Sequence, residues 1–266
     1  MDFDFGLITA PFRMQPGLRR LMPGARHLTP LAPGSALFAE KRKVHEAGAS
    51  RHSAAGFDPG PALAAIAQQG RIDGLDAFDP HRLELAFEED FTVLDGADGT
   101  LPWLCVCVPS HWAPEDKLGL DFAAVHAPVA DNAALLGAGP SLVALATSGE
   151  RWERFVWTIS PSPRHDQHPR RQPRAPWPSG EDEQAFVRGC WLRVERQTFF
   201  PVGQGTRQAV FTIRVMLQPL AEAIDGTDKA ARLHAALGSM SEAVLAYKGL
   251  APAREPLLRW LARKAA

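Results

Sequence analysis

His126 is the residue whose type and position most clearly indicate chemistry. It ends the apolar run Phe122-Ala-Ala-Val-His126, and Pro128 follows two residues later. An imidazole beside Val125 and Pro128 is partly removed from water, which favours the neutral form that ligates a metal ion or accepts a proton. A histidine on an apolar helix face is also commonly structural, with its ring nitrogens hydrogen-bonded. The residues alone leave both interpretations open.

A second candidate is the run Arg193-Val-Glu-Arg-Gln-Thr198, which lies in a predicted strand. Because side chains alternate along a strand, Arg193, Glu195 and Gln197 share one face, whereas Arg196 lies on the other. Arginine binds carboxylates through two parallel hydrogen bonds, and a carboxylate can hold an alkylammonium group or relay protons. The alternative is an exposed face whose Arg and Glu side chains form weak cross-strand pairs.

Three further residues could contribute to such a site. Trp157, in Phe155-Val-Trp-Thr-Ile159, offers an indole face to a cationic amine, although a strand tryptophan is usually a core residue. Lys117 and Arg214 are cations that could bind an anionic group, and a surface strand arginine is the alternative for Arg214. The segment Gly203-Gln-Gly205 opens like a dinucleotide-binding motif, but the third glycine is absent and a strand follows, so we reject a nucleotide site there.

The composition is that of an ordinary soluble globular protein. The 266 residues are 45% hydrophobic and 22% charged, with a formal net charge of -1, and nothing in them indicates a nucleic-acid or membrane partner. Cys105, Cys107 and Cys190 are odd in number and lack zinc-type spacing, which indicates reduced thiols. No signal-peptide pattern or apolar window of about 18 residues is present. We therefore expect a cytoplasmic protein.

The first half of the chain is predicted to hold two helices and a hairpin. Residues 1–60 are rich in Pro, Gly, Arg and Ala and are expected to be irregular, and a helix is expected near residues 61–68. Two β-rich runs, 83–94 and 101–108, flank an Asp/Gly turn and predict a hairpin. A second helix is expected to begin near Pro114, run to His126 and end before Pro128.

The second half predicts three more strands and a helical end. Strands are expected at 154–160, 189–198 and 207–217, which together favour an antiparallel sheet. The prolines of residues 161–178 exclude regular structure there, and the arginines are expected to keep this loop solvated. Helices are expected at residues 220–237, 239–247 and 254–264.

Several of these motifs, taken in order, resemble one family. They are Lys117-x-Gly119, Val125-His-x-Pro-Val129, Trp191-Leu-Arg-Val-Glu-Arg-Gln-Thr198 and Phe211-Thr-Ile-Arg214. On these the chain resembles, over about residues 84–250, the haem-binding alpha subunit of the haem-dependent oxidative N-demethylase family. The resemblance implies an α+β fold: a PAS-like antiparallel sheet flanked by helices, with a helical C-terminal segment. We expect residues 1–60 to form an N-terminal extension, 61–250 the haem-binding domain and 251–266 a C-terminal helix.

The resemblance also implies an activity and a site. The activity is a haem-dependent monooxygenase reaction, the oxidative N-demethylation of a small amine by dioxygen at a b-type haem, with electrons from NADPH through separate flavin and iron–sulfur partner proteins. His126 would be the axial ligand of the haem iron, and Glu195 and Trp157 would lie near the substrate. The haem propionates would meet four cations, namely Lys117, Arg193, Arg196 and Arg214. The alternative is a non-enzymatic haem-binding PAS-like sensor or an oxidase subunit.

Two departures from the family pattern qualify this expectation. An Arg-Leu-Pro element of the family stands here as Phe199-Phe200-Pro201, and a Thr-Tyr pair stands as Val215-Met216. Both changes replace polar groups near the expected site with apolar ones. We therefore expect a more apolar pocket, and hence a different substrate or weaker oxygen activation.

Overall fold

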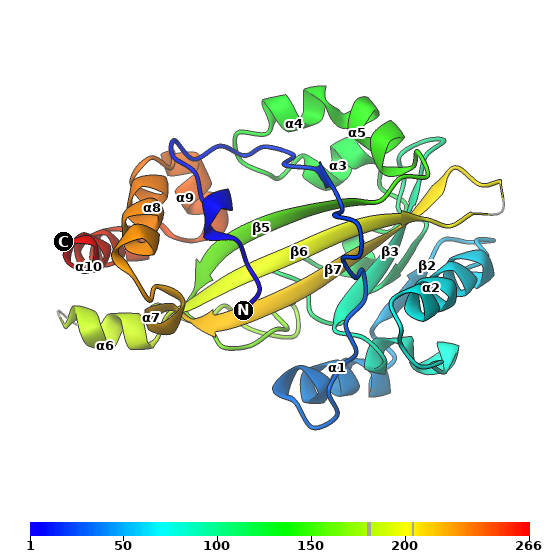
Figure 1. Cartoon of the computed structure of the whole chain (residues 1–266), viewed down its shortest axis with the longest axis horizontal. Coiled ribbons are helices and arrows are strands. Elements are labelled where there is room, and N and C mark those ends of the chain that lie inside the picture. Colours follow the sequence, from blue (N-terminus) through cyan, green and yellow to red (C-terminus); the bar gives the residue numbers. More distant parts are fainter. Residues whose placement is uncertain (180–181, 204) are drawn as a thin grey trace.

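A seven-stranded, fully antiparallel sheet runs through the molecule (Figure 1). The computed structural model describes residues 1–179, 182–203 and 205–266, so Gln204 of the rejected nucleotide motif lies outside the described residues. The strands stand in the order β1-β5-β6-β7-β3-β4-β2. Their bounds are β1 Arg19–Arg20, β2 Arg51–Ser53, β3 Glu89–Asp95, β4 Trp103–Cys105, β5 Trp152–Ser160, β6 Trp191–Pro201 and β7 Gln208–Pro219.

Helices cover both faces of this sheet. Figure 1 shows α3, α4 and α5 together beside β5, with α8, α9 and α10 at the other end of the strands. The bounds are α1 Ala36–Glu46, α2 Gly60–Ile72, α3 Phe122–His126, α4 Ala133–Gly137, α5 Gly139–Ala146, α6 Glu183–Arg188, α7 Leu220–Ala223, α8 Thr227–Gly238, α9 Glu242–Lys248 and α10 Arg254–Ala265. Short 3-10 turns lie at Phe5–Leu7, Pro80–Leu85, Pro114–Asp116 and Ala251–Ala253. The mixed helix and strand architecture with an antiparallel sheet is confirmed.

Strand alternation and register divide the sheet into two faces. Directly paired residues lie on the same face, so Glu195 shares a face with its partners Val156 and Val215. We call this the site face. Val194 pairs with Trp157 and Met216 on the other side, which we call the opposite face.

Four apolar clusters fix the helices on these faces. On the opposite face, α6 to α10 pack against one end of β5–β7, and α2 packs against β3 and β4 at the other end. On the site face, α1 covers Ile213 and Val215, while Phe122 and Val143 bring α3 and α5 against Phe199 and Phe211. Burial of these apolar side chains is the main force that holds the layers together.

The N-terminal extension is more ordered than expected. It contains the 11-residue helix α1, capped by Ser35, and it contributes the edge strands β1 and β2. Lys41 of α1 is fully buried, and its Nζ lies 3.0 Å from Asp90 Oδ1 of β3. Nζ also donates to the carbonyls of Phe87 and Glu89. The expectation of an irregular segment was wrong because this pairing with a distant acid cannot be seen in local composition.

Two boundaries in the middle of the chain also differ from expectation. The hairpin is confirmed as β3 and β4, but β3 begins at Glu89 because residues 80–85 form a 3-10 turn. No continuous helix runs from Pro114 to His126. Gly119 adopts a left-handed φ of 72°, and α3 begins only after Asp121, whose carboxylate accepts from Ala124 N at 2.8 Å. His126 is the last residue of α3, as expected.

The later segments agree with expectation except in two places. Strands β5, β6 and β7 are confirmed, and residues 161–178 form no helix or strand. This loop is not simply solvated, however, because Asp166, Gln167 and His168 in its middle are buried. The helix expected at 220–237 is divided into α7 and α8 by Ile224-Asp-Gly226. Among the described residues, no helix is long and apolar enough to cross a membrane.

Candidate functional site

His126 is held in one orientation at the end of α3. Its Nδ1 lies 2.7 Å from the carbonyl oxygen of Phe122, one helical turn earlier, and the Phe122 ring packs against the imidazole with centroids 4.1 Å apart. Burial lowers the pKa of His126, and the nearby charges of Arg154 and Lys117 lower it further. A neutral ring that donates from Nδ1 presents a lone pair on Nε2, and this nitrogen makes no hydrogen bond to the described residues.

Lys117 supports the same turn of α3. Its Nζ donates to the carbonyl of Val125, next to His126, at 3.1 Å, and burial lowers the pKa of the amine. An ammonium group has three N–H donors, and this bond uses one of them. Lys117 therefore stabilises the end of the helix and retains donors for a second acceptor.

Glu195 lies half-buried at the centre of the site face, and its neighbours fix the carboxylate. Oε1 accepts a short hydrogen bond from Ser110 Oγ, and Oε2 accepts from Gln197 Nε2 at 2.8 Å. Arg193 in turn donates from Nε to Ser110 Oγ at 2.8 Å. As the alternation predicts, Arg193, Glu195 and Gln197 act on one face. Ser110 was missed by the sequence analysis because its loop reaches β6 only in the folded chain.

Arg193 holds two loops in place and, among the described residues, has no acid partner within ion-pair distance. It is only 1% exposed, and its guanidinium donates to three backbone carbonyls, at His165 (2.9 Å), Arg164 (3.1 Å) and Val108 (3.4 Å). Burial lowers the pKa of Arg193 to about 10. Its donors are engaged by these loops, so the structure gives it a positioning role around Glu195.

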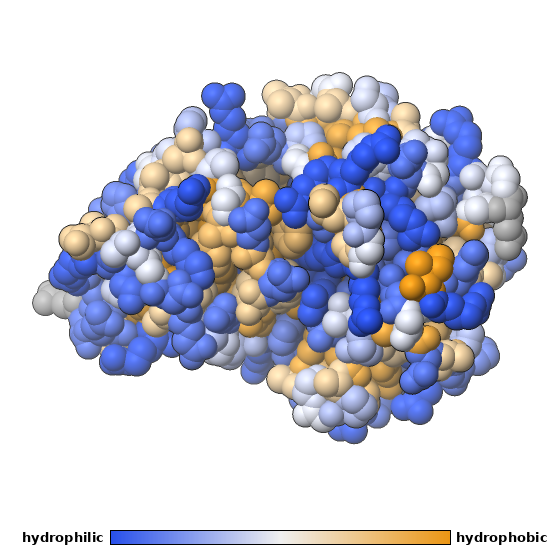
Figure 2. Space-filling model, in the orientation of Figure 1, coloured by the Kyte–Doolittle hydropathy of each residue, from blue (hydrophilic) through white to orange (hydrophobic). Residues whose placement is uncertain are grey.

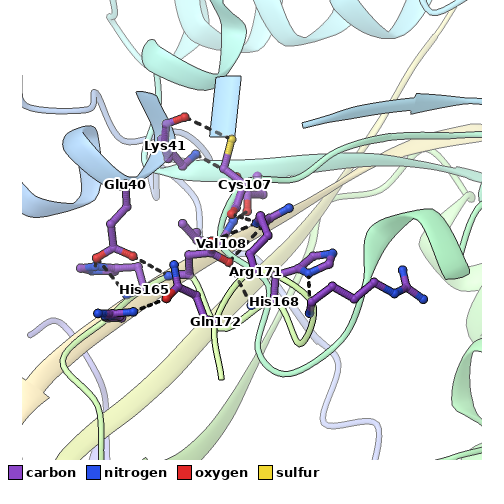
Figure 3. A network of polar contacts seen from close by, with 12 residues as sticks. Glu40, Lys41, Cys107, Val108, His165, His168, Arg171 and Gln172 are labelled. Carbon is purple, nitrogen blue, oxygen red and sulfur yellow. Dashed lines mark hydrogen bonds and ion pairs between the residues drawn. The ribbon is translucent and has the colours of Figure 1, made fainter. Parts of the chain in front are cut away.

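A polar network continues from these loops to helix α1 (Figure 3). Glu40 accepts from the backbone N–H groups of His165 and Asp166, at 3.2 and 2.6 Å, and Arg171 donates to the carbonyl of Cys107 at 2.9 Å. Arg171 also pairs with Asp166 at 3.0 Å. The N-terminal helix thereby braces the 161–178 loop, which Arg193 ties to the site face.

Arg154 is a site-face residue that the sequence analysis overlooked. It stands beside Gln197 in the sheet register, and its buried Nε has no hydrogen-bond partner among the described residues. Burial lowers the pKa of Arg154, and Glu195 and Tyr247 are the charges that act on it. The sequence did contain a signal for this placement. Arg154 stands three residues before Trp157 in a predicted strand, so the two side chains lie on opposite faces of the sheet.

Helix α9 brings two more ionisable groups to this place. Although Tyr247 is 44% exposed, desolvation by the surrounding protein raises its pKa, and desolvation lowers the pKa of Lys248 to about 8. Both groups lie close enough to Glu195 and Arg154 for those charges to act on them. Lys248 Nζ donates to the carbonyl of Trp157 at 2.9 Å. We call His126, Arg154, Glu195, Tyr247 and Lys248 the site cluster.

Contacts between distant segments close the surroundings of the site cluster. Asp131, before α4, accepts from Ser241 Oγ at the start of α9 at 2.7 Å, and Trp177 Nε1 donates to the carbonyl of Gly249 at 3.0 Å.

His111, next to Ser110, has a positive φ of 61°, which is uncommon outside glycine. Although His111 is exposed, desolvation by the surrounding protein lowers its pKa to about 4.

Three predicted site residues lie on the opposite face. Trp157 is 7% exposed and packs in the core with an edge-on contact to Phe12, and among the described residues its ring meets the site cluster only through Lys248, whose Nζ lies 5.8 Å from the ring centroid. Arg196 pairs with Glu153 at 3.0 Å, and Arg214 pairs with Glu88 at 2.7 Å. Their contacts match the alternative interpretations given above, which were a core tryptophan for Trp157 and ion pairs between strands for the arginines.

The two departures from the family pattern are likewise divided between the faces. Phe199 and Val215 lie on the site face, where Phe199 stacks on Phe211 with centroids 4.6 Å apart. Phe200 and Met216 point into the core of the opposite face. The expectation of a more apolar site therefore applies to Phe199 and Val215 but not to Phe200 and Met216.

The described residues contain no cluster of three His, Cys, Asp or Glu side chains that could hold a bare metal ion. A porphyrin iron needs only one axial side chain, which His126 can supply. Residues 81–258 match the model of a protein family described as haem-dependent oxidative N-demethylase, alpha subunit-like. The match begins just before β3 and ends within α10, so it includes every member of the site cluster and excludes α1 and α2. The chain belongs to the haem-dependent oxidative N-demethylase alpha subunit-like family.

Proposed function

We propose that this protein is a haem-dependent monooxygenase subunit that removes an N-methyl group from an amine. His126 would be the axial ligand of a b-type haem, and Glu195 would hold the substrate. NADPH would be the electron source, through separate flavin and iron–sulfur partners. A PAS-like description of the sheet and a cytoplasmic location are parts of the same proposal.

The state of His126 is the observation that supports haem binding best. The Phe122 carbonyl fixes the Nδ1 tautomer, burial favours the neutral ring, and Nε2 remains without a partner among the described residues. Metal-bound histidines commonly donate their other ring N–H to a backbone carbonyl or carboxylate in this way, which orients the ring and increases its basicity. The donor set therefore fits one axial position of a haem iron.

The propionate contacts require a revised assignment. Arg193, Arg196 and Arg214 are engaged with carbonyls or acids, so we assign them structural roles. Lys117 retains N–H donors beside His126, and it is our candidate propionate partner. Trp157 is left out of the proposed site because it lies in the opposite core.

Glu195 would act on the amine. Its carboxylate is oriented by Ser110 and Gln197, which leaves lone pairs for an alkylammonium N–H. A carboxylate in this position would hold the substrate ammonium group and accept its proton before oxidation. When bound, the haem would activate dioxygen so that one oxygen atom enters the N-methyl carbon and the other leaves as water, and the hydroxymethylamine then splits into amine and formaldehyde.

The first test is the absorption spectrum of the purified protein after reconstitution with hemin, oxidised and then reduced with dithionite, with and without carbon monoxide. We expect a Soret band that is lost or shifted in His126→Ala. A matched control is His27→Gln, because His27 also bonds through Nδ1, to Thr198, and its Nε2 has no partner among the described residues, but it lies fully buried on the opposite face. A wild-type protein without a Soret band, or an unchanged spectrum in His126→Ala, would contradict the proposal.

A second measurement separates an enzyme from a haem sensor. The apolar Phe199 and Val215 on the site face favour a substrate or oxygen chemistry different from that of the family pattern. Formaldehyde should form when the haem-loaded protein is supplied with an N-methylated amine, dioxygen and a chemical reductant. Spectral change without formaldehyde would instead identify a non-enzymatic haem-binding module.

A further inference from the structure

A small cavity lies at the free edge of β5, beside the site cluster. Strand β1 pairs with only the first two residues of β5, so the backbone edge beyond them is covered by residues 7–19 instead of a strand. The cavity has a volume of about 120 Å³. We call it the edge pocket. Its walls come from the N-terminal segment, from β5 and from the end of α9, and they include Phe12, Met14, Arg154, Val156, Trp157 and Lys248.

The edge pocket carries positive charge without matching acid. Among the residues that line it are Arg13, Arg19, Arg154 and Lys248, and none is Asp or Glu. Arg19 pairs with Glu153 at 2.9 Å, an acid that it shares with Arg196. In contrast, among the described residues Arg154 Nε is buried without a partner, and Lys248 donates its one hydrogen bond to a neutral carbonyl. The Lys248 ammonium also lies over the rings of Phe12 and Trp157, 5.4 and 5.8 Å from their centroids, but these contacts bring no negative charge. Buried cations are normally paired, so this pocket suits an anion that the described residues do not supply.

Glu195 does not itself line the edge pocket, but two lining residues of β5 lie next to it in the sheet. Arg154 and Val156 are on the site face, and Val156 stands directly opposite Glu195 in the sheet. Arg154 and Glu195 are then diagonal neighbours, about 7–8 Å apart at their backbones, a distance that two long side chains can span with a small molecule between them. A cation and an acid placed in this way recognise a molecule with one negative and one positive end.

We propose that the edge pocket binds the carboxylate of a small N-methylated amino acid, with Arg154 and Lys248 as its partners and Glu195 holding the ammonium group. The role of this ligand as the substrate rests on the function proposed above, but its binding does not. An engineered cavity of about 150 Å³ accepts benzene, so a ligand of roughly six or seven heavy atoms suits the edge pocket. N,N-dimethylglycine is of this size and carries both charges.

The test is isothermal titration calorimetry on the full chain, with and without haem. Three probes separate the charges: N,N-dimethylglycine, dimethylamine, which lacks the carboxylate, and 3-methylbutanoate, which replaces the nitrogen with carbon. We expect N,N-dimethylglycine to bind both forms of the protein. The other two probes should bind about tenfold or more weakly, since each loses one charged contact.

Variants assign the binding to the edge pocket. Arg154→Gln and Lys248→Met should each weaken N,N-dimethylglycine binding roughly tenfold to a hundredfold. Arg20→Gln is the matched control, because Arg20 is a neighbouring β1 cation whose side chain is 69% exposed and faces Glu150. The Arg20→Gln variant should bind N,N-dimethylglycine with the same affinity as the wild type. Two independent variants keep the test decisive if one of them fails to fold.

Three outcomes would overturn the proposal. They are no binding of N,N-dimethylglycine in either form, undiminished binding in both variants, and binding only to the haem-free protein. Binding only to the haem-free protein would show that haem propionates pair with Arg154 and Lys248 once haem is bound. The haem-free titration does not depend on oxidation, so a failure of the proposed function appears as a missing Soret band or missing formaldehyde while carboxylate binding persists. Turnover of dimethylamine without carboxylate binding would refute this inference alone.

Discussion

The two faces of the sheet hold their arginines in different ways. On the opposite face, Arg196 and Arg214 each meet an acid, Glu153 at 3.0 Å and Glu88 at 2.7 Å. On the site face, Arg193 donates to loop carbonyls and Ser110, and Arg154 has a buried Nε without any partner among the described residues. The four side chains come from strands β5, β6 and β7 of one sheet.

This difference separates charges that stabilise the fold from charges that are free to bind. An arginine that meets an acid has its charge balanced inside the fold, whereas a buried arginine without an acid costs desolvation energy unless a ligand offsets it. The residue type is the same in all four cases. The comparison therefore separates Arg154, together with Lys248, from the paired arginines as the cations that the proposed ligand would meet.

The largest effect should come from Arg193→Met. This change removes the donor to Ser110 and to three carbonyls in a fully buried place, so we expect the free energy of unfolding to fall by about 3–5 kcal/mol in urea denaturation. Arg193→Lys should recover part of it, because an ammonium group can reach only some of these acceptors. An effect below about 1 kcal/mol would mean that Arg193 is not the residue that anchors the loops.

The next effect concerns a buried acid of the opposite face. Burial raises the pKa of Glu89 to about 7, and its Oε1 has no hydrogen-bond partner among the described residues. The folded state thus holds a proton that the unfolded state releases near its usual pKa, so stability should fall by on the order of 3 kcal/mol as the pH rises from about 4.5 to 7. This fall should be absent in Glu89→Gln. An identical pH dependence in wild type and variant would contradict it.

Lys248, a member of the site cluster, should give a pH dependence of stability with the opposite sign. Its pKa is lowered to about 8 by burial, so between pH 8 and its usual value of 10.5 the unfolded state binds more protons than the folded state. Stability should therefore rise with pH across this window, and Lys248→Met should remove that rise. Unfolding by urea at pH 7.5, 9 and 10 measures the effect. A wild-type stability that declines over this range as steeply as that of the variant would argue against a buried, unneutralised amine.

The smallest effect should come from Arg214→Gln. Its ion pair with Glu88 is 22% and 25% exposed, so we expect a loss of about 1 kcal/mol or less, weakened further by salt. The haem spectrum should not change. A change in the Soret band would place Arg214 back among the cofactor contacts and would weaken the distinction between the two faces.

Much of the sheet could be predicted from the sequence because its signals are local. Alternation in β6 placed Arg193, Glu195 and Gln197 on one face, and the turn residues before β4 indicated the hairpin. Proline two residues after His126 correctly marked the end of α3. The expected helix from Pro114 failed because Gly119 takes a left-handed φ, a backbone choice that the apolar pattern does not reveal.

Local sequence patterns are enough to predict which residues alternate, that His126 ends its helix and which charges are present. Which of those charges are neutralised depends on the folded chain, because the partners come from distant segments. Arg214 meets Glu88 across 126 residues, and Lys41 meets Asp90 from a segment expected to be irregular. Arg154 meets no such acid within the described residues. Coulomb energy depends on distance and burial, and both are properties of the folded chain.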